Sequence, residues 1–318
     1  MLNRRHLRIK VLQILYAFFQ SEEESILKAE NELLSAVERM YDMYLFMLMS
    51  LPELKRAALN HMDAHKKKLR PTEDDLNPST KFVNNVLIEA IESSYELTKL
   101  SETRKVNWLG AESQEIFRKL YLNVIESEVF FEHMNNDSEG LEADMAFALQ
   151  LFKAEIANSD LIQSFFDEKS IYWADDLDLC CSMAMKTMKT MKTWAKGKAF
   201  EILPLYKEND DEKEFIVNLL RKTLQMNAEN EALISEFAQN WELDRIAKMD
   251  ILLLKMGLTE LQTCSSIPTK VTLNEYIEIS KFYSTPKSNL FINGVLDKAI
   301  TQLTKDKKIV KIGRGLIT

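Results

Sequence analysis

The sequence is poor in the residues that interrupt helices. Glycine occurs 7 times and proline 6 times in 318 residues, well below the usual shares of about 7% and 5%. Long stretches instead repeat apolar residues at spacings of three and four, which is the period of an amphipathic helix. The composition therefore predicts an all-α fold.

Cysteine is also scarce. The chain has three cysteines, Cys180, Cys181 and Cys264, an odd number with no C-x-x-C spacing. A secreted disulfide scaffold needs paired cysteines, and a zinc ribbon needs paired C-x-x-C motifs. Both classes are excluded.

Motifs for catalysis are missing as well. No phosphate-binding glycine loop, dinucleotide fingerprint or nucleophile elbow is present, and no histidine follows a glutamate by three residues. His61 and His65 stand four residues apart, but they lack the glutamate of a zinc-protease helix, and Lys66 to Lys68 follow directly. We expect no metal, no cofactor and no catalytic residue, and hence no enzyme.

Long apolar runs are absent too. The stretch Val11 to Phe19 is interrupted by Gln13 and Tyr16 and has no cleavage site after it, so it does not read as a signal peptide. The run Met40 to Leu51 contains Asp42 and is shorter than the roughly 20 residues that span a bilayer. We expect a cytoplasmic protein without membrane segments.

Charge is unevenly distributed along the chain, whose formal net charge is −8. Residues 1–10 carry four basic residues and no acid, and residues 305–318 carry five basic residues and one acid. Residues 21–210 contain 35 acidic and 22 basic residues. A polyanion would therefore be repelled by the middle of the chain and attracted at its ends.

The first basic segment lies on a predicted helix. Apolar residues from Leu7 to Phe18 recur at helical spacing and predict a core-facing stripe, whereas Arg4, Arg5 and Arg8 fall largely outside it. Guanidinium groups bind phosphates and stack on bases, so this segment is a candidate platform for single-stranded RNA.

The C-terminal part predicts three more helices. Trp241 to Leu261 forms the most apolar stretch, and Thr272 with Glu275 forms a capping-box pattern that opens a helix running to Phe282. Ser284, Thr285 and Pro286 predict the start of the next helix. Gly294 lies inside that helix at a cost of about 1 kcal/mol relative to alanine, which predicts either a close backbone approach or a role other than stability.

These segments resemble the NusB family of transcription antitermination factors. The resemblance covers RRHLRIKVLQILY from Arg4, WELDRIAKMDILLLKMGLTEL from Trp241, IPTKVTLNEYIEISKFYSTPKSNLFINGVLDKAI from Ile267 and, more weakly, FIVNLL from Phe215. It implies a NusB-like helical bundle made of residues 1–20 and 211–304, enlarged by an inserted set of acidic helices over 21–210. Residues 305–318 would form a basic tail.

The resemblance also implies a function. Family members bind the boxA element of nascent transcripts, especially ribosomal RNA leaders, together with the ribosomal small-subunit protein NusE, and act on the transcription elongation complex. An exposed Phe291 ring would join the arginine segment in contacting RNA. At Lys287 this chain departs from the resemblance, which implies an acidic residue there, so a partner contact at this position does not follow from it, although the lysine adds positive charge. The RNA-binding residues implied in this chain are Arg4, Arg5, Arg8, Gln13, Tyr16, Asn274, Lys287, Asn289, Phe291 and Asn293.

Two other functions compete with this one. The chain could be a non-catalytic helical scaffold that binds a protein through its acidic insertion. NusB-like domains also occur fused to RNA cytosine methyltransferases, but that activity needs a glycine-rich cofactor loop and a catalytic cysteine domain, and neither is found here. The sequence leaves open the RNA sequence preference, the role of residues 21–210, the oligomeric state, and whether the basic tail binds phosphates or is disordered.

Overall fold

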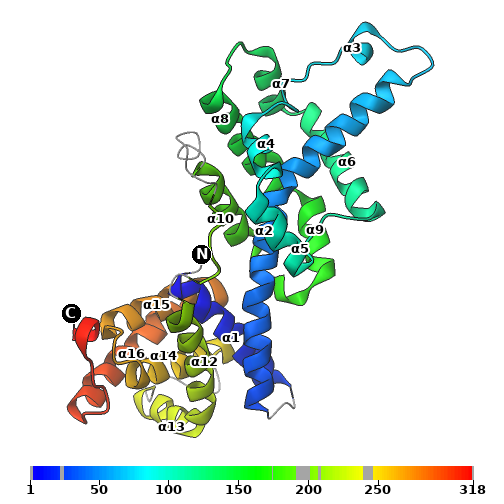
Figure 1. Cartoon of the computed structure of the whole chain (residues 1–318). Coiled ribbons are helices and arrows are strands. Elements are labelled where there is room, and N and C mark those ends of the chain that lie inside the picture. The colour runs from blue at the N-terminus through cyan, green and yellow to red at the C-terminus, as the bar shows by residue number, and fades with distance from the viewer. Residues whose placement is uncertain are drawn as a thin grey trace. The chain divides into compact units, whose positions relative to one another are not determined.

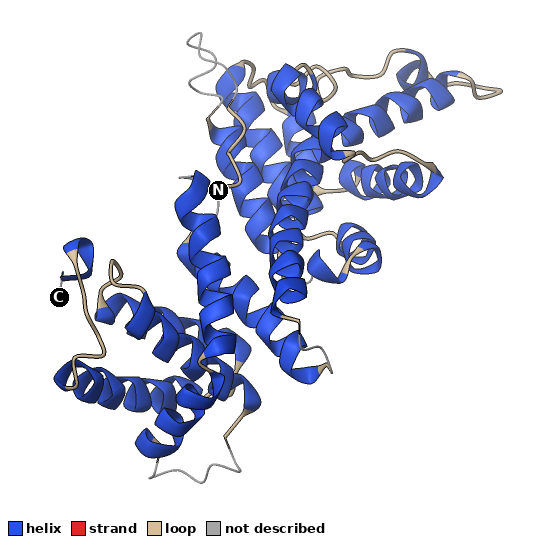
Figure 2. Cartoon of the chain, turned by 60° about the horizontal axis from the view of Figure 1, so that its bottom comes forward, coloured by secondary structure: helices blue, strands red, loops and turns tan. Residues whose placement is uncertain are grey.

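The computed structural model describes residues 3–21, 25–173, 175–190, 201–206, 209–238 and 246–316. These residues form helices joined by loops, with no β-strand among them (Figure 2). The predicted all-α class is confirmed. The chain divides into two compact units, Met1–Val37 with Tyr206–Thr318, and Glu38–Leu205. The boundary at residues 37 and 38 falls inside the long helix α2 (Ile26–Lys66) and inside the predicted insertion of residues 21–210.

Unit 1 contains the two ends of the sequence. Its helix α1 begins where the Asn3 side chain accepts a hydrogen bond from the His6 backbone N–H at 3.0 Å, and Leu7, Val11 and Leu15 are fully buried as their spacing predicts. The elements of this unit besides α2 (Figure 1) are α1 (Arg4–Gln20), α12 (Asn209–Gln225), α13 (Asn227–Phe237), α14 (Lys248–Thr263), α15 (Thr269–Tyr283), α16 (Ser288–Lys305) and the short 3₁₀ turn η4 (Gly313–Leu316).

Helix α14 lies at the centre of unit 1 and packs against α1, α12, α13, α15 and α16. The predicted core residues Leu252, Leu253 and Met256 are buried on it. Its Gly257 packs tightly against α16, because a Cβ atom there would lie 3.1 Å from Leu296 Cδ2. The close approach predicted at Gly294 stays a prediction.

Two helix starts differ from the predictions, and a third cannot be compared. Helix α15 begins at Thr269 after Pro268, not at a capping box, since Thr272 and Glu275 bond to other helices. Helix α16 begins at Ser288, whose hydroxyl accepts a hydrogen bond from the Thr285 N–H at 3.1 Å. The predicted start at Trp241 lies outside the described residues.

Unit 2 has an aromatic core of its own. Trp108 is 2% exposed, contacts the rings of Phe46, Phe117 and Phe165, and donates its indole N–H to the Phe46 carbonyl at 2.9 Å. The elements of this unit, besides α2, are α3 (Glu73–Leu76), α4 (Val86–Glu92), α5 (Tyr95–Arg104), α6 (Ala111–Ile125), α7 (Glu128–Asn135), α8 (Leu141–Leu151), the π-helical segment η1 (Phe152–Ile156), α9 (Asp160–Lys169), η2 (Ile171–Trp173) and α10 (Leu177–Lys189).

Within the described part of the chain, no helix combines the length and the apolar character that crossing a membrane would require.

Candidate nucleic-acid interface

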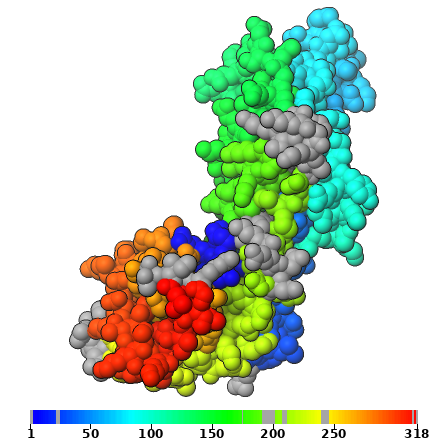
Figure 3. All heavy atoms as spheres, turned by 60° about the vertical axis from the view of Figure 1, so that its left-hand side comes forward, coloured from blue at the N-terminus to red at the C-terminus, as the bar shows by residue number. Residues whose placement is uncertain are grey.

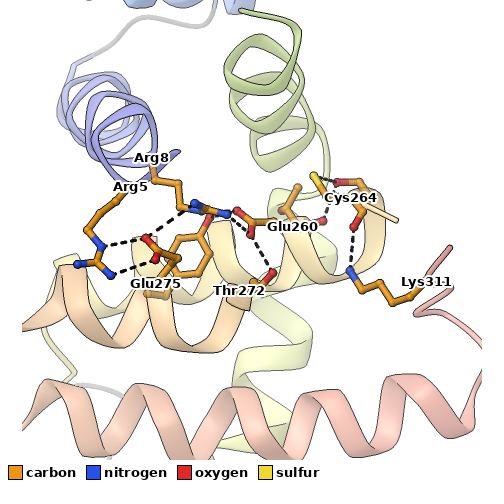
Figure 4. A network of polar contacts seen from close by, with 10 residues as sticks. Arg5, Arg8, Glu260, Cys264, Thr272, Glu275 and Lys311 are labelled. Carbon is orange, nitrogen blue, oxygen red and sulfur yellow. Dashed lines mark hydrogen bonds and ion pairs between the residues drawn. The ribbon is translucent and has the colours of Figure 1, made fainter. Parts of the chain in front are cut away.

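A buried ion pair joins α1 to α14. The Arg8 side chain is 1% exposed and that of Glu260 is 0% exposed. Arg8 Nε and Nη2 donate to the two Glu260 carboxylate oxygens at 2.7 and 2.6 Å. Thr272 Oγ1 and the Tyr276 hydroxyl donate to the same carboxylate at 2.8 and 3.0 Å (Figure 4). Each carboxylate oxygen therefore has two donors, which is the condition for a buried charge to be tolerated.

The electrostatics of this cluster keep Arg8 and Tyr276 in one protonation state. Burial would lower the pKa of Arg8, but the charge of Glu260 and its hydrogen bonds raise the pKa above its ordinary value. Burial, followed by the Glu260 charge, raises the pKa of Tyr276 well above its ordinary value. Arg8 thus stays charged and Tyr276 stays a donor. In this position Arg8 fixes α1 to the core and does not reach solvent.

Arg5 forms an ion pair and is still partly exposed to solvent. Its Nε and Nη2 donate to the Glu275 carboxylate on α15 at 2.9 and 3.0 Å, and this hydrogen bonding raises the pKa of Arg5. The side chain is nevertheless 38% exposed. Arg5 therefore presents part of its guanidinium group to solvent in an orientation fixed by Glu275.

Arg4 is the most accessible of the three arginines. Its guanidinium carbon lies 5.2 Å from the centre of the Phe215 ring, and that of Arg8 lies 5.2 Å from the same ring. A guanidinium group over an aromatic ring is held by the charge distribution of the ring. Among the residues described here, Arg4 makes no ion pair, so its hydrogen-bond donors are available to a ligand.

A surface groove of about 620 Å³ begins at these arginines. Its lining combines arginines of α1 with Glu275 and with a mostly apolar part from the loop between α14 and α15 and the first turn of α15. Its lining residues are Asn3, Arg4, Arg5, Arg8, Ser266, Ile267, Pro268, Val271 and Glu275. The groove offers cations beside an apolar surface, which suits a nucleotide.

The remaining predicted site residues all lie in unit 1. Tyr16 is 42% exposed. Gln13 and Asn289 are half-buried. The side-chain oxygen of Asn289 accepts a hydrogen bond from the Leu290 N–H at 2.9 Å. Those that are exposed are Asn274, Lys287 and Asn293.

The expectation of an exposed ring at Phe291 is wrong, and so is that of an exposed Arg8. Phe291 is 9% exposed because it lies on the apolar face of α16 together with Val295. Figure 4 shows α15 lying between α1 and α16, and α1 packs against α12, α14 and α15. Because the Phe291 ring is buried, it does not form an exposed RNA surface with the arginine segment.

The basic tail packs against the groove's loop. Lys311 Nζ donates to the Cys264 carbonyl at 2.9 Å, and the Ile312 N–H donates to the Ser265 carbonyl at 3.1 Å. Ile309 is 8% exposed, and burial lowers the pKa of Lys311. Figure 3 shows the red tail lying against the orange helices of the same unit. Through residue 316 the tail is thus a packed segment that supports the loop.

Sequence reasoning missed Glu260 and Phe282. Glu260 follows Leu253 and Met256 by seven and four residues, so an acid stands on the buried stripe of α14, and that position is a detectable sign of a buried basic partner. Phe282 is 81% exposed, and an aromatic at a helix end gives no sign in the sequence of which way it points.

Comparison with known proteins identifies the family. A model of the NusB family matches residues 182–301, which include α12 to α15 and most of α16. The transcription antitermination protein NusB of Salinibacter ruber is 43% identical over 110 residues, a match that covers 35% of this chain and 69% of that protein. The chain belongs to the NusB family.

Two further NusB proteins also match about a third of this chain. The protein of Chloroherpeton thalassium is 37% identical over 105 residues, covering 33% of this chain and 50% of its own length. The protein of Natranaerobius thermophilus is 34% identical over 109 residues, and this match covers 34% of this chain and 78% of that protein. No solved structure matches the chain. Helix α1 lies outside the segment matched by the NusB family model, yet it packs against α12, α14 and α15 from that segment.

Proposed function

We propose that this protein is a non-catalytic transcription antitermination factor that acts in the cytoplasm. It binds boxA-like single-stranded RNA together with the NusE ribosomal small-subunit protein, as part of a transcription elongation complex. The observation that carries the proposal is the position of Arg4 and Arg5, which lie with free surface on the unit that contains the NusB-family helices.

The proposed chemistry is recognition. Arg4 and Arg5 contact phosphates, while the accessible polar and aromatic side chains contact bases and sugars. Arg8 and Phe291 are left out of the proposed contacts, because their side chains are buried. The proposed contact residues are Arg4, Arg5, Gln13, Tyr16, Asn274, Lys287, Asn289 and Asn293.

The test is electrophoretic binding of a boxA-containing RNA, with and without NusE, at several salt concentrations. Each phosphate contact to a single strand contributes about −0.7 to the log–log dependence of affinity on salt. We expect Arg4→Ala to weaken binding and to make that slope less negative by about 0.7. Arg118→Ala is the matched control, since Arg118 is an exposed arginine of unit 2 that pairs with Glu115.

A helical scaffold is the competing function. Residues 38–205 have their own core and carry 28 acidic and 20 basic residues, whereas the rest of the chain carries 21 of each. An acidic unit of this kind suits a protein partner better than RNA. If the RNA affinity depends neither on salt concentration nor on the Arg4→Ala substitution, the scaffold function is favoured and the proposed function is rejected.

A further inference from the structure

Phe282 is exposed to an unusual degree for an aromatic residue. It is the penultimate residue of α15, and 81% of its surface is accessible, more than for any other aromatic residue that the structure describes. A single exposed apolar side chain is common on protein surfaces, so exposure alone does not mark a site. What singles out this ring is its position relative to Arg4 and Arg5.

The helical register places this ring on the same face as the arginine pair. Phe282 follows Glu275 by seven residues, which is two turns and about 10 Å along the helix. Val271, Glu275, Glu278 and Phe282 form one stripe along α15. Arg5 is bound to Glu275 within this stripe, and Val271 borders the groove that contains Arg4. A strand lying in the groove would thus run along α15 toward the ring.

We propose that Phe282 is a base-stacking site for the single-stranded RNA whose phosphates contact Arg4 and Arg5. This inference rests on the proposed function and adds a residue to the same surface. A phenyl ring supplies a stacking face to any base, and the cations two turns away supply the phosphate contacts that keep the strand on this helix.

The neighbours of the ring favour RNA over a protein partner. The stripe between Val271 and Phe282 holds the ion pairs Arg5–Glu275 and Lys281–Glu278, and Asn274 beside it is exposed. Protein hot spots lie in well-packed apolar pockets, which a ring flanked by ion pairs does not form.

The experiment compares variants of the full chain by fluorescence anisotropy with a boxA-containing RNA. Loss of one stacked base costs about 1 to 3 kcal/mol, so we expect Phe282→Ala to weaken binding by about 5- to 150-fold with the salt dependence unchanged. Phe282→Trp should retain the affinity. The matched control is Phe131→Ala, which removes an aromatic ring that is 67% exposed on α7 of unit 2.

A base analogue gives a direct readout of stacking. In RNA carrying 2-aminopurine at successive positions, wild-type protein should quench the fluorescence at one position more than Phe282→Ala does. Because the side chain is exposed, both proteins should have the same thermal midpoint, so loss of fold does not confuse the result.

The outcomes separate the two proposals. If the wild-type chain does not bind the RNA, the proposed function fails. If it binds in an Arg4-dependent way and Phe282→Ala binds equally well, only the stacking site is rejected. The stacking site is also rejected if Phe282→Ala retains RNA affinity and loses binding to NusE, because the ring would then contact protein.

Discussion

At the scale of single residues, three arginines within five positions of α1 meet three different environments. Arg4 lies over the Phe215 ring, Arg5 is held by Glu275 at the surface, and Arg8 is buried against Glu260. Chemically identical side chains therefore divide into two that can meet a ligand and one that holds the helix in place. Residue type alone does not distinguish these roles.

The buried Arg8–Glu260 pair predicts a large loss of stability when only one of its two charges is removed. Glu260→Gln removes the charge that compensates Arg8, and breaking a buried pair from one side costs about 3 to 5 kcal/mol. We expect this loss in the free energy of unfolding, measured with urea.

The matched control is Glu229→Gln. Glu229 pairs with Lys308, and both side chains are about half exposed, at 48% and 49%. Exposed pairs contribute about 1 kcal/mol or less. Equal effects of the two substitutions would show that Glu260 does not compensate a buried charge.

Residue spacing explains why Arg8 and Phe291 were misplaced by sequence reasoning. Arg8, Leu12 and Leu15 are separated by four and three residues, and all three are buried. The buried face of α1 is thus wider than the stripe begun by Leu7. Periodicity marks such a face, but the charge of Arg8 argues against burial until its partner Glu260, 252 positions away, is known. For Phe291 the periodicity alone gives the right answer, because its four-residue spacing to Val295 marks it as a core residue.

At the scale of elements, the existence of helices was predictable and their starts were less so. Low glycine and proline content and apolar periodicity predicted helices over most of the chain. The start of α15 was misjudged because Thr272 and Glu275 fit a capping box locally while Glu260 and Arg5 bind them in the folded protein. Tertiary partners decide between such alternatives, and a local motif does not include them.

The contact between the tail and the α14–α15 loop gives a prediction for an element. A Cβ atom at Gly315 would lie 2.0 Å from the Ser265 carbonyl oxygen, which is shorter than any allowed contact. We expect Gly315→Ala to displace the tail and to speed tryptic cleavage after Lys311, whose amino group is otherwise bound to the Cys264 carbonyl.

Gly313→Asn serves as the control for that experiment. Gly313 has a φ of +52°, and a Cβ atom added there would meet nothing within 4 Å. Asparagine tolerates this left-handed conformation. Trypsin should cleave the Gly313→Asn protein after Lys311 at the same rate as the wild-type protein. A Gly315→Ala protein that is cleaved no faster than this control would refute the proposed tail contact.

At the scale of the whole molecule, buried histidines contribute to how stability responds to mild acid. The chain has four histidines, and desolvation is the main cause that lowers the pKa of His6, His61 and His133. The unfolded chain, with histidine pKa values near 6.5, then binds more protons than the folded chain as the pH falls. Stability should therefore decrease from about pH 7 to about pH 5.

His133 offers the cleanest test of this dependence. It is 4% exposed, its ring is stacked on Phe147 with centroids 3.6 Å apart, and its Nε2 has no hydrogen-bond partner in the described part of the chain. We expect His133→Phe to lose less unfolding free energy than the wild type between pH 7.5 and pH 5.5, measured with urea. Identical losses in both proteins would mean that burial of His133 does not contribute.

The pairing of Arg8 with Glu260 also has a consequence for protein synthesis. The two residues are 252 positions apart, and a ribosome that adds about 5 to 20 residues per second needs roughly 13 to 50 seconds to travel between them. During that interval the arginine helix has been made but its anchoring carboxylate has not. Residues 38–205 leave the ribosome first as a complete set, so the unit formed from the two chain ends is the last to assemble.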